Sequence, residues 1–373
     1  MAVLFFIIFV LWLLGFVFLY RVPLCQASAA AEPCKVSVIV PARDEAHNLP
    51  TLLASLAEQQ PAPFEIVVVD DGSADRTAEV ARAHGATVVA SKPLPDGWRG
   101  KTWACYQGAE AARGEVLMFV DADTFFEPGG FERILGAWEN GDAVLSLGPW
   151  HAVQRPYEDL SAFFNLLMTA GTGAFTLFSA KHPPAGLFGQ FLMLDRGTYF
   201  ETGGHKLVKG RILENFYLAG ELARRGVPMQ CRGGKRAFSM RMYPGGLAEL
   251  VNGWSKAFSS GAAQTPRWIL LLTIVWITGG LLAPIYLATG LVAVSPLNIE
   301  LAALLYVLYA AQVWTMLRRL GAFRWYTAAF YPVPLVFYLV VFTRSAILSA
   351  LGKEVAWKGR RMNQPVSQDE PPC

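Results

Sequence analysis

The chain has 373 residues, of which 53% are hydrophobic, 13% aromatic and only 16% charged, and its mean hydropathy is +0.33. Soluble domains carry about 25% charged residues, so this composition favours a membrane protein and excludes a disordered chain, which would be poor in apolar residues. The net charge of +3 is spread thinly, without the basic run that binds nucleic acid, and no nucleic-acid partner is expected.

The cysteines show no pattern that predicts a metal site or a disulfide framework. None of the five stands in a CxxC pair, and their spacing suggests no pairing. They are Cys25, Cys34, Cys105, Cys231 and Cys373. A reduced main domain that faces the cytosol is the simplest interpretation.

The N-terminus predicts a membrane anchor over residues 1–21. Residues 1–20 carry no charge and have about the length of one bilayer crossing, and Arg21 follows directly. A cleavable signal peptide would begin with basic residues, which are missing, so an uncleaved anchor is favoured. Arg21 and Lys35 are the nearest positive charges, which places the following domain in the cytosol.

A globular domain is predicted over residues 35–265, where apolar strands alternate with helices. The predicted strands are 36–40, 64–69, 86–90 and 116–120, and helices are predicted at 46–60 and 77–84. Continuous apolar strands alternating with helices indicate an α/β fold with a mostly parallel sheet that is buried on both faces. Ligands of such sheets bind beyond the carboxyl ends of the strands.

The C-terminal third, residues 266–350, predicts further membrane segments, and residues 351–373 form a basic and polar tail. Uncharged stretches lie at 268–299, 301–317 and 325–343. Arginines after the second stretch place the loop that follows it in the cytosol, and lysines and arginines place the tail there as well. Both cannot hold if the last stretch crosses the membrane once, because a single crossing would put the loop and the tail on opposite sides. Pro332 and Pro334 interrupt that stretch, so an interfacial or re-entrant element is expected. The chain is predicted to cross the cell (inner) membrane several times, and the sequence leaves open whether the number of crossings is odd or even.

Residues 160–180 are also uncharged and long enough to span a bilayer. A crossing there would separate Asp121 and Asp123 from everything that follows them. The Gly, Ser, Thr and Asn content of this stretch suits a segment that lies on a surface, so an interfacial platform facing the membrane is expected.

Two acidic motifs follow predicted strands. Asp70 and Asp71, in DDGS, either accept hydrogen bonds from a base and a ribose or merely form a turn. Asp121 and Asp123, in DAD, are alternate residues that project the same way from an extended chain. Such hard oxygen ligands suit Mg²⁺ or Mn²⁺ together with substrate phosphates, whereas the plainer interpretation is two solvated acids in a loop.

The order and separation of three motifs resemble the inverting family 2 glycosyltransferases, which have a GT-A fold. The motifs are VSVIVPARDEAHNL, VVVDDGSADRT and GKTWACYQGAEAARGEVLMFVDADT, and the resemblance covers roughly residues 35–265. A narrower resemblance, to the 4,4'-diaponeurosporenoate glycosyltransferases of carotenoid biosynthesis, rests on further segments. These are GKTWACYQG, FNLLMTAGTGAF, ETGGHK, FSMRMYPGGL, GWSKAFSSGA and VAWKGRRM.

The resemblance implies a site for a UDP-sugar. Pro41, Arg43 and Glu45 fall where the family's first loop borders the nucleotide, and Asp71 matches the acid that reads the uracil ring, with Asp70 beside it.

Three further residues complete the implied donor site. Lys101 matches a basic residue near the nucleotide. Asp121 and Asp123 match the DXD motif, with Asp123 as the direct ligand of Mg²⁺ or Mn²⁺, which stabilises the leaving diphosphate.

The family's catalytic acidic pair is incomplete in this chain. The segment reads Ile212-Leu213-Glu214-Asn215-Phe216, so Glu214 is the only carboxylate left to act as a base, unless it merely caps or packs. A hydroxyl acceptor needs a base, but a carboxylate acceptor with a pKa of roughly 4 is already ionised at neutral pH. The loss of one acid therefore suggests an acid acceptor.

Four residues are weaker candidates for the acceptor or diphosphate site. In place of the QxxRW motif of processive synthases the chain has Trp254 and Lys256, which either reach the substrates or form an interfacial pair. His205 and Gln190 fall where the family lines the acceptor pocket, although lone histidines are usually structural.

The expected function is a membrane-bound transferase that moves a hexose, glucose from UDP-glucose, onto a carotenoid acid or similar lipid with inversion. Another lipid acceptor, such as a ceramide, hopanoid or polyprenyl phosphate, is the first alternative. A processive polysaccharide synthase fits less well, because QxxRW is missing and the spans are few. A non-catalytic membrane scaffold is favoured only by Asn215 and disfavoured by the intact Asp121 and Asp123.

Overall fold

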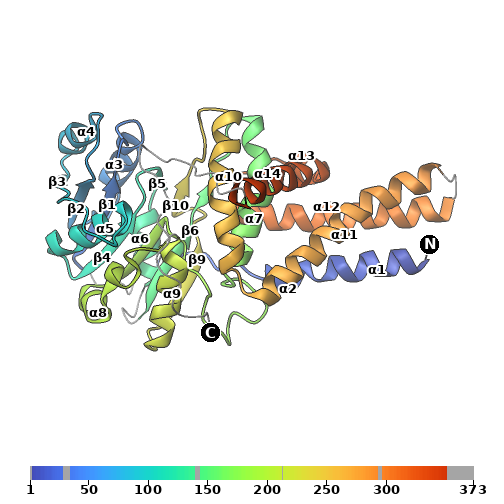
Figure 1. The fold of residues 1–373 in the computed structure, drawn as a ribbon, viewed down its shortest axis with the longest axis horizontal. Helices are drawn as coiled ribbons and strands as arrows, with labels where there is room; N and C mark the ends of the chain where they lie inside the picture. Colours follow the sequence, from blue (N-terminus) through green and yellow to red (C-terminus); the bar gives the residue numbers. More distant parts are fainter. Residues whose placement is uncertain (1, 28–33, 139–142, 212, 293–295, 351–373) are drawn as a thin grey trace.

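The structure, a computed structural model, describes residues 2–27, 34–138, 143–211, 213–292 and 296–350. The predicted tail, residues 351–373, lies outside the described residues. The described chain forms an α/β part and a bundle of long helices that extends away from it, with the N-terminus near the far end of the bundle (Figure 1).

Seven strands form the central sheet in the order β3-β2-β1-β4-β8-β6-β9. They are β1 (Val36–Ala42), β2 (Glu65–Asp70), β3 (Thr87–Ala90), β4 (Val116–Val120), β6 (Val144–Gly148), β8 (Phe191–Asp195) and β9 (Met229–Gly233). Neighbours pair in parallel except at β8, which is antiparallel to both β4 and β6. The four predicted strands correspond to β1 to β4, and the prediction of a mostly parallel α/β sheet is confirmed.

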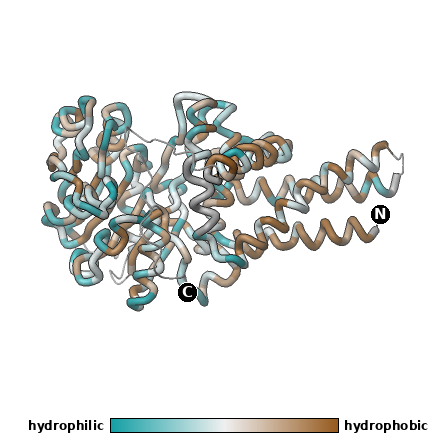
Figure 2. The backbone as a smooth tube through the Cα atoms, in the orientation of Figure 1, coloured by the Kyte–Doolittle hydropathy of each residue, from teal (hydrophilic) through white to brown (hydrophobic). Residues whose placement is uncertain are grey.

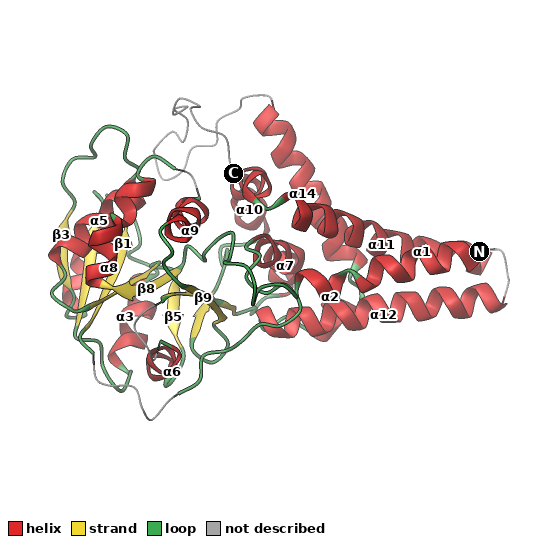
Figure 3. Ribbon diagram, turned by 90° about the horizontal axis from the view of Figure 1, so that it is seen from below, coloured by secondary structure: helices red, strands yellow, loops and turns green. Residues whose placement is uncertain are grey.

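Helices cover both faces of the sheet (Figure 3). One face packs against α3 (Leu49–Ala57), α4 (Thr77–Ala83) and α6 (Gly130–Ala137). The other packs against α5 (Gly100–Ala111), α8 (Arg196–Thr202), the 3₁₀ helix η2 (Gly204–Val208) and α9 (Glu214–Arg224). Gly108 lets α5 approach closely, since a Cβ there would stand 2.4 Å from Ile39 Cγ2. The C-terminal half of α5 is thereby packed closely against β1 and β2.

A smaller sheet extends the region that follows β4. It consists of β5 (Thr124–Phe126), β10 (Phe238–Met240) and β7 (Trp150–His151), in the order β5-β10-β7. Because β5 begins only four residues after β4 ends, the acidic turn at residues 121–123 is held between the two sheets.

The bundle contains α1 (Ala2–Leu13), α2 (Gly15–Phe18), α11 (Arg267–Val292) and α12 (Pro296–Leu320). Figure 2 shows that its helices are mostly hydrophobic. Two of them, at Arg267–Val292 and Asn298–Leu320, are long and apolar enough to cross a membrane, and the apolar helix at Val3–Phe18 is shorter. The predicted boundary at residue 299 is wrong. Residues 296–299 already belong to α12, because proline is accepted in a first helical turn and an uncharged turn does not interrupt the apolar pattern.

The last predicted segment is broken, as its prolines indicate. It forms α13 (Trp325–Ala329) and then α14 (Pro332–Ala350), which begins at the first proline. In the described part of the chain α14 packs against α7 (Ala162–Gly171) and α10 (Leu247–Gln264), close to the α/β part, with only slight contact to α11. Whether α14 enters a membrane remains a prediction.

The expected surface segment at residues 160–180 is instead largely a core helix. After η1 (Pro156–Ser161), α7 (Ala162–Gly171) buries every residue except Met168. It lies between the α/β part and α10, α11, α12 and α14, which cover its aromatic side chains. Ten residues span about 15 Å, too short for a crossing. The exposed large apolar residues of this stretch are Met168 and, in the following loop, Leu177 and Phe178.

Buried ionic contacts join the helices to the α/β part. Asp159, which is 4% exposed, accepts hydrogen bonds from Arg324 Nη1 at 2.6 Å, Thr327 Oγ1 at 2.7 Å and Tyr326 OH at 3.2 Å. Glu158 pairs with Arg241 Nη2 at 2.7 Å. Breaking such buried pairs costs several kcal/mol, so the orientation of the helices relative to the sheet is well defined.

Candidate active site

The loops after β1 and β2 meet at the carboxyl edge of the sheet. The Asp71 amide donates to Ala42 O at 2.8 Å, which prolongs the pairing of the two strands. Arg43 Nη1 donates to Asp71 O at 3.1 Å, and the Asp71 side chain is almost buried. A guanidinium and a carboxylate therefore stand side by side where the resemblance implies the uracil ring.

The other predicted nucleotide residues lie beside this pair. Asp70 Oδ1 accepts from the Ser73 amide at 3.0 Å, so this acid has the turn role given as its plainer interpretation. Glu45 Oε2 accepts from Asn48 Nδ2 at 2.6 Å, and Pro41 lines the adjoining pocket. Contacts of these residues with a nucleotide remain predictions.

Asp121 and Asp123 occupy the turn between β4 and β5. Thr124 fixes the turn, because its hydroxyl donates to Asp121 O at 2.6 Å. Asp123 reaches solvent at the edge of the cleft. Partial desolvation in the cleft and the nearby carboxylates of Asp121 and Glu45 raise the pKa of Asp123 to about 7. The repulsion behind this shift would be relieved by a cation.

This pair of carboxylates fits a divalent ion. Among the described residues no group of three or more His, Cys, Asp or Glu side chains converges on one metal position. Mg²⁺ and Mn²⁺ need only one or two carboxylates when substrate phosphates and water supply the other ligands. Hard oxygen donors whose charges repel one another are the donor set that such an ion prefers, so Asp121 and Asp123 fit it.

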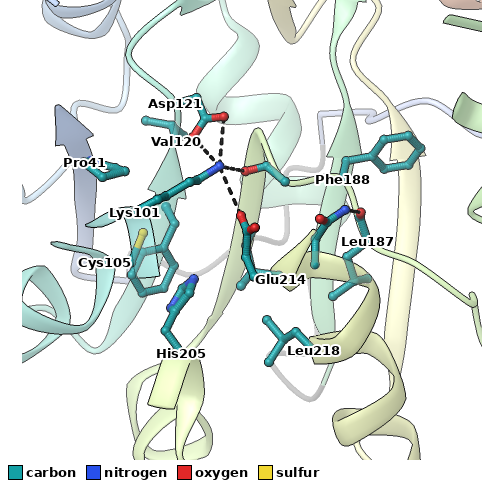
Figure 4. A pocket seen from close by; sticks show the side chains of 14 residues that line it. Pro41, Lys101, Cys105, Val120, Asp121, Leu187, Phe188, His205, Glu214 and Leu218 are labelled. Carbon is teal, nitrogen blue, oxygen red and sulfur yellow. Dashed lines mark hydrogen bonds and ion pairs between the residues drawn. The ribbon is translucent and has the colours of Figure 1, made fainter. Parts of the chain in front are cut away.

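Lys101, in the first turn of α5, connects Asp121 on one side of the pocket with Glu214 on the other (Figure 4). Its Nζ lies 2.8 Å from Asp121 Oδ1, 2.9 Å from Gly189 O and 3.4 Å from Glu214 Oε1. Burial alone would lower the pKa of the Lys101 ammonium, but the two carboxylates outweigh it and raise that pKa well above its usual value. Lys101 is therefore a permanent cation between Asp121 and Glu214, the predicted base.

Glu214 begins α9, after Leu213 in a left-handed conformation with φ 59°. Its carboxylate enters the pocket and pairs with Lys101, which favours a role in the pocket over mere capping. Asn215 also lines the pocket, but its side-chain amide donates to the backbone carbonyl of Leu187. The two neighbours on α9 thus have different partners.

His205 lines the pocket, whereas Gln190 lies next to the lining residue Gly189 and is not itself a lining residue. His205 is 5% exposed, its Nδ1 is 3.0 Å from Tyr199 OH, and its ring packs edge-on against Phe119. Burial lowers the pKa of His205 to about 4, so the ring is neutral at physiological pH. Gln190 contributes its carbonyl, which accepts from the Asp121 amide at 3.2 Å.

The structure places Trp254 away from the pocket. It is 1% exposed, stacks on Phe164 at 4.6 Å between ring centroids, and donates from Nε1 to Ser161 Oγ at 3.1 Å. The predicted contact of Trp254 with an acceptor is wrong, because the ring is buried against Phe164 of α7 and Tyr243. Lys256 lies in α10, but its side chain is outside the described residues.

Sequence reasoning missed Leu187, Phe188 and Gly189, which line the pocket. Gly189 O accepts from Lys101, and the Phe188 amide donates to Ser146 Oγ at 2.8 Å. The only available signal was the pair Gly186 and Gly189, which precedes β8. Backbone acceptors carry no side-chain pattern, and Ser146 is one polar residue in an apolar strand.

Comparison with known proteins agrees with this geometry. Residues 37–211 match the family described as glycosyl transferase family 2. The chain is 33% identical over 330 residues to the 4,4'-diaponeurosporenoate glycosyltransferase of Staphylococcus aureus strain USA300, covering 87% of this chain and 88% of that protein. The protein of the same description from strain MRSA252 is 32% identical over the same length.

A solved structure extends the likeness to the whole fold. The mannosyltransferase PcManGT from Pyrobaculum calidifontis, in complex with GDP-Man and Mn²⁺, superposes with a TM-score of 0.56 at 18% identity. The match covers 95% of this chain and 97% of that one, so it includes the helical bundle. The expected GT-A fold flanked by apolar helices is confirmed.

Proposed function

Since the chain belongs to glycosyltransferase family 2, we propose that it transfers glucose from UDP-glucose, with inversion, to the carboxylate of a carotenoid acid. The observation that carries the acceptor is the 33% identity over 87% of the chain to a 4,4'-diaponeurosporenoate glycosyltransferase. The reaction class follows from the family, whereas the donor, the stereochemistry and the acceptor are the proposal.

In this scheme different residues bind the nucleotide base and the metal ion. Arg43 and Asp71 border the uracil, while Asp123 and Asp121 hold Mg²⁺ or Mn²⁺. The bound ion acts as a Lewis acid towards the diphosphate of the donor. Lys101 Nζ holds the Asp121 carboxylate at 2.8 Å, and the neutral His205 forms part of the pocket wall.

The transfer itself is one displacement. A carboxylate oxygen forms a bond to the anomeric carbon as the bond from that carbon to the diphosphate oxygen breaks, and UDP leaves with the electron pair. No proton moves, because an acid acceptor is ionised before it attacks. Lys101, together with Arg99, which is close enough to Glu214 for their charges to interact, offsets the negative charge that such an acceptor brings.

The helical bundle supports a membrane location for this reaction. Its outward side chains are apolar, as at Phe6, Leu271 and Val307. Arg21, Arg267, Arg318 and Arg319 stand at the end of the bundle nearest the catalytic domain, which favours a cytosolic domain. Crossings by α1, α11 and α12 alone would return both the domain and the tail to the cytosol, so the conflict over parity disappears if α14 does not cross.

The role of Glu214 separates an acid acceptor from a hydroxyl acceptor. In Glu214→Gln, transfer to a carotenoid acid is expected to fall less than about tenfold, because no base is required. Transfer to an alcohol of similar shape is expected to fall at least about a hundredfold, the usual contribution of a general base. Purified enzyme, UDP-glucose and the two acceptors provide the assay, with UDP binding as the test of folding.

Two results would go against the proposal. If wild-type enzyme glucosylates the alcohol and leaves the acid unchanged, the acceptor is a hydroxyl lipid. If Glu214→Gln abolishes transfer to the acid while it still binds UDP, the argument from the ionised carboxylate fails.

A further inference from the structure

The side chain of Asn215 faces the backbone of a neighbouring segment. Its Nδ2 donates to the carbonyl of Leu187, and the Leu187 amide donates back to the carbonyl of Asn215 at 3.3 Å. The side chain is part-buried, and its hydrogen bond reaches the segment that leads into β8. An acid at this position in the family would be read as a catalytic base, but here the position is occupied by a donor that already has an acceptor.

The segment Leu187–Gln190 is held along its whole length. Each of its residues has a backbone contact: Leu187 O with Asn215, the Phe188 amide with Ser146 Oγ at 2.8 Å, Gly189 O with Lys101 Nζ at 2.9 Å and Gln190 O with the Asp121 amide at 3.2 Å. The anchors come from α9, β6, α5 and the end of β4. The segment therefore connects α9, which carries the predicted base Glu214, with Lys101 and Asp121.

The contacts close into a ring. Asn215 holds Leu187, Gly189 holds Lys101, and Lys101 pairs with Glu214, the residue next to Asn215. A Cβ at Gly189 would lie 3.6 Å from Asn215 Cγ and 3.7 Å from Lys101 Nζ, so only a small residue fits between them without displacing either. A shift of α9 would move Glu214 and Lys101 together.

We infer that Asn215 is a positioning residue that sets the acceptor side of the pocket, Glu214 and Lys101, through its bond to the Leu187 carbonyl. The inference deepens the proposed function and rests on it. An amide suits this task because a carbonyl accepts only from a donor. An aspartate at position 215 would place a second acceptor against that carbonyl and a second negative charge beside Glu214.

A protonated aspartic acid, in contrast, can donate its hydroxyl to Leu187 O. In Asn215→Asp the native arrangement therefore favours the protonated acid, which raises the pKa of the new side chain above its ordinary value of about 3.9. The bond is present below that raised pKa and is lost as the pH rises through it. Activity of the variant relative to wild type should follow the same course.

The other titratable groups of the pocket are shared by both proteins. They are Lys101 and Cys105 of α5, Asp121 after β4, His205 of η2 and Glu214 of α9, with Arg99 and Asp123 nearby. Their titrations largely cancel when the variant rate is divided by the wild-type rate at each pH. The ratio isolates the substituted side chain.

The test compares Asn215→Asp with Asn215→Leu, which has a similar size and no donor. Glucose transfer to the carotenoid acid is measured from pH 5 to pH 8. At pH 8 both variants should lose about a hundredfold in kcat, the cost of a small misplacement, with the KM for UDP-glucose little changed. At pH 5 Asn215→Asp should recover to within about fivefold of wild type, while Asn215→Leu should not recover.

Three outcomes would overturn the inference. They are an Asn215→Asp rate equal to wild type at every pH, a rate above wild type at pH 8, which would mark position 215 as a base, or a ratio that stays low at pH 5. If Asn215→Asp does not fold, Asn215→Ser, which retains an O–H donor, must exceed Asn215→Ala in kcat, and equal rates contradict the inference. Absence of transfer by the wild type would instead refute the proposed function.

Discussion

Replacing Asp123 by alanine is expected to lower the rate of glucose transfer by at least about a thousandfold, the effect of removing a main electrostatic group from a transition state. Asp123 stands in the DXD motif, and its pKa is raised to about 7 by desolvation and by the carboxylates of Asp121 and Glu45. A divalent cation bound there would relieve the repulsion among these carboxylates. Without Asp123 the leaving diphosphate loses its charge compensation.

Asp96→Ala is the matched control, because Asp96 is an exposed acid in the loop between β3 and α5. It should retain wild-type activity. Asp123→Ala should not lower the thermal unfolding temperature, since the carboxylate that it removes is repelled by Asp121 and Glu45. Wild-type turnover by Asp123→Ala, or full activity of the wild type in excess chelator, would contradict the assignment.

Replacing Lys101 by methionine is expected to lower kcat by at least about a hundredfold, as in other removals of one preorganised charge. Methionine retains much of the length of lysine but none of its contacts with Asp121, Gly189 and Glu214. Two carboxylates then face each other without the cation between them, and the Gly189 carbonyl loses its donor. Because Lys101 contacts Asp121 on the donor side and Glu214 on the acceptor side, the KM values for both substrates should rise as well.

Lys101→Arg keeps the charge but not the compact geometry of an ammonium, so its kcat should lie between those of the wild type and Lys101→Met. Steady-state kinetics with each substrate varied in turn distinguish the variants. A kcat of Lys101→Met within about threefold of wild type, in a folded protein, would show that the bridge has no catalytic importance.

The central sheet was predictable because buried parallel strands leave continuous apolar runs. β1, β2, β3 and β4 were predicted to within two residues at each end. β8 was not, since an antiparallel strand in the middle of a parallel sheet has the same apolar composition as its neighbours. α7 was expected on a surface because its Gly, Ser, Thr and Asn content suggested an interfacial segment, whereas packing against several other helices buries it.

The site was predictable where side chains follow strand ends, and less so where the backbone contributes. Asp71, Asp121 and Asp123 lie where parallel strands must bring them. The contact of Lys101 with Gly189, 88 residues away, depends on how α5 and β8 pack. Trp254 was misassigned because an interfacial tryptophan and a buried one have the same local sequence.

The most direct measurement of the central claim is the chemical linkage in the product. Purified protein is incubated with UDP-glucose, Mg²⁺ or Mn²⁺ and a carotenoid acid, with the corresponding carotenoid alcohol in a parallel reaction, and the products are treated with mild alkali. The account predicts a glucosylated carotenoid acid that alkali splits into glucose and the free acid, as an ester must. An alkali-stable glucoside formed only from the alcohol would contradict it.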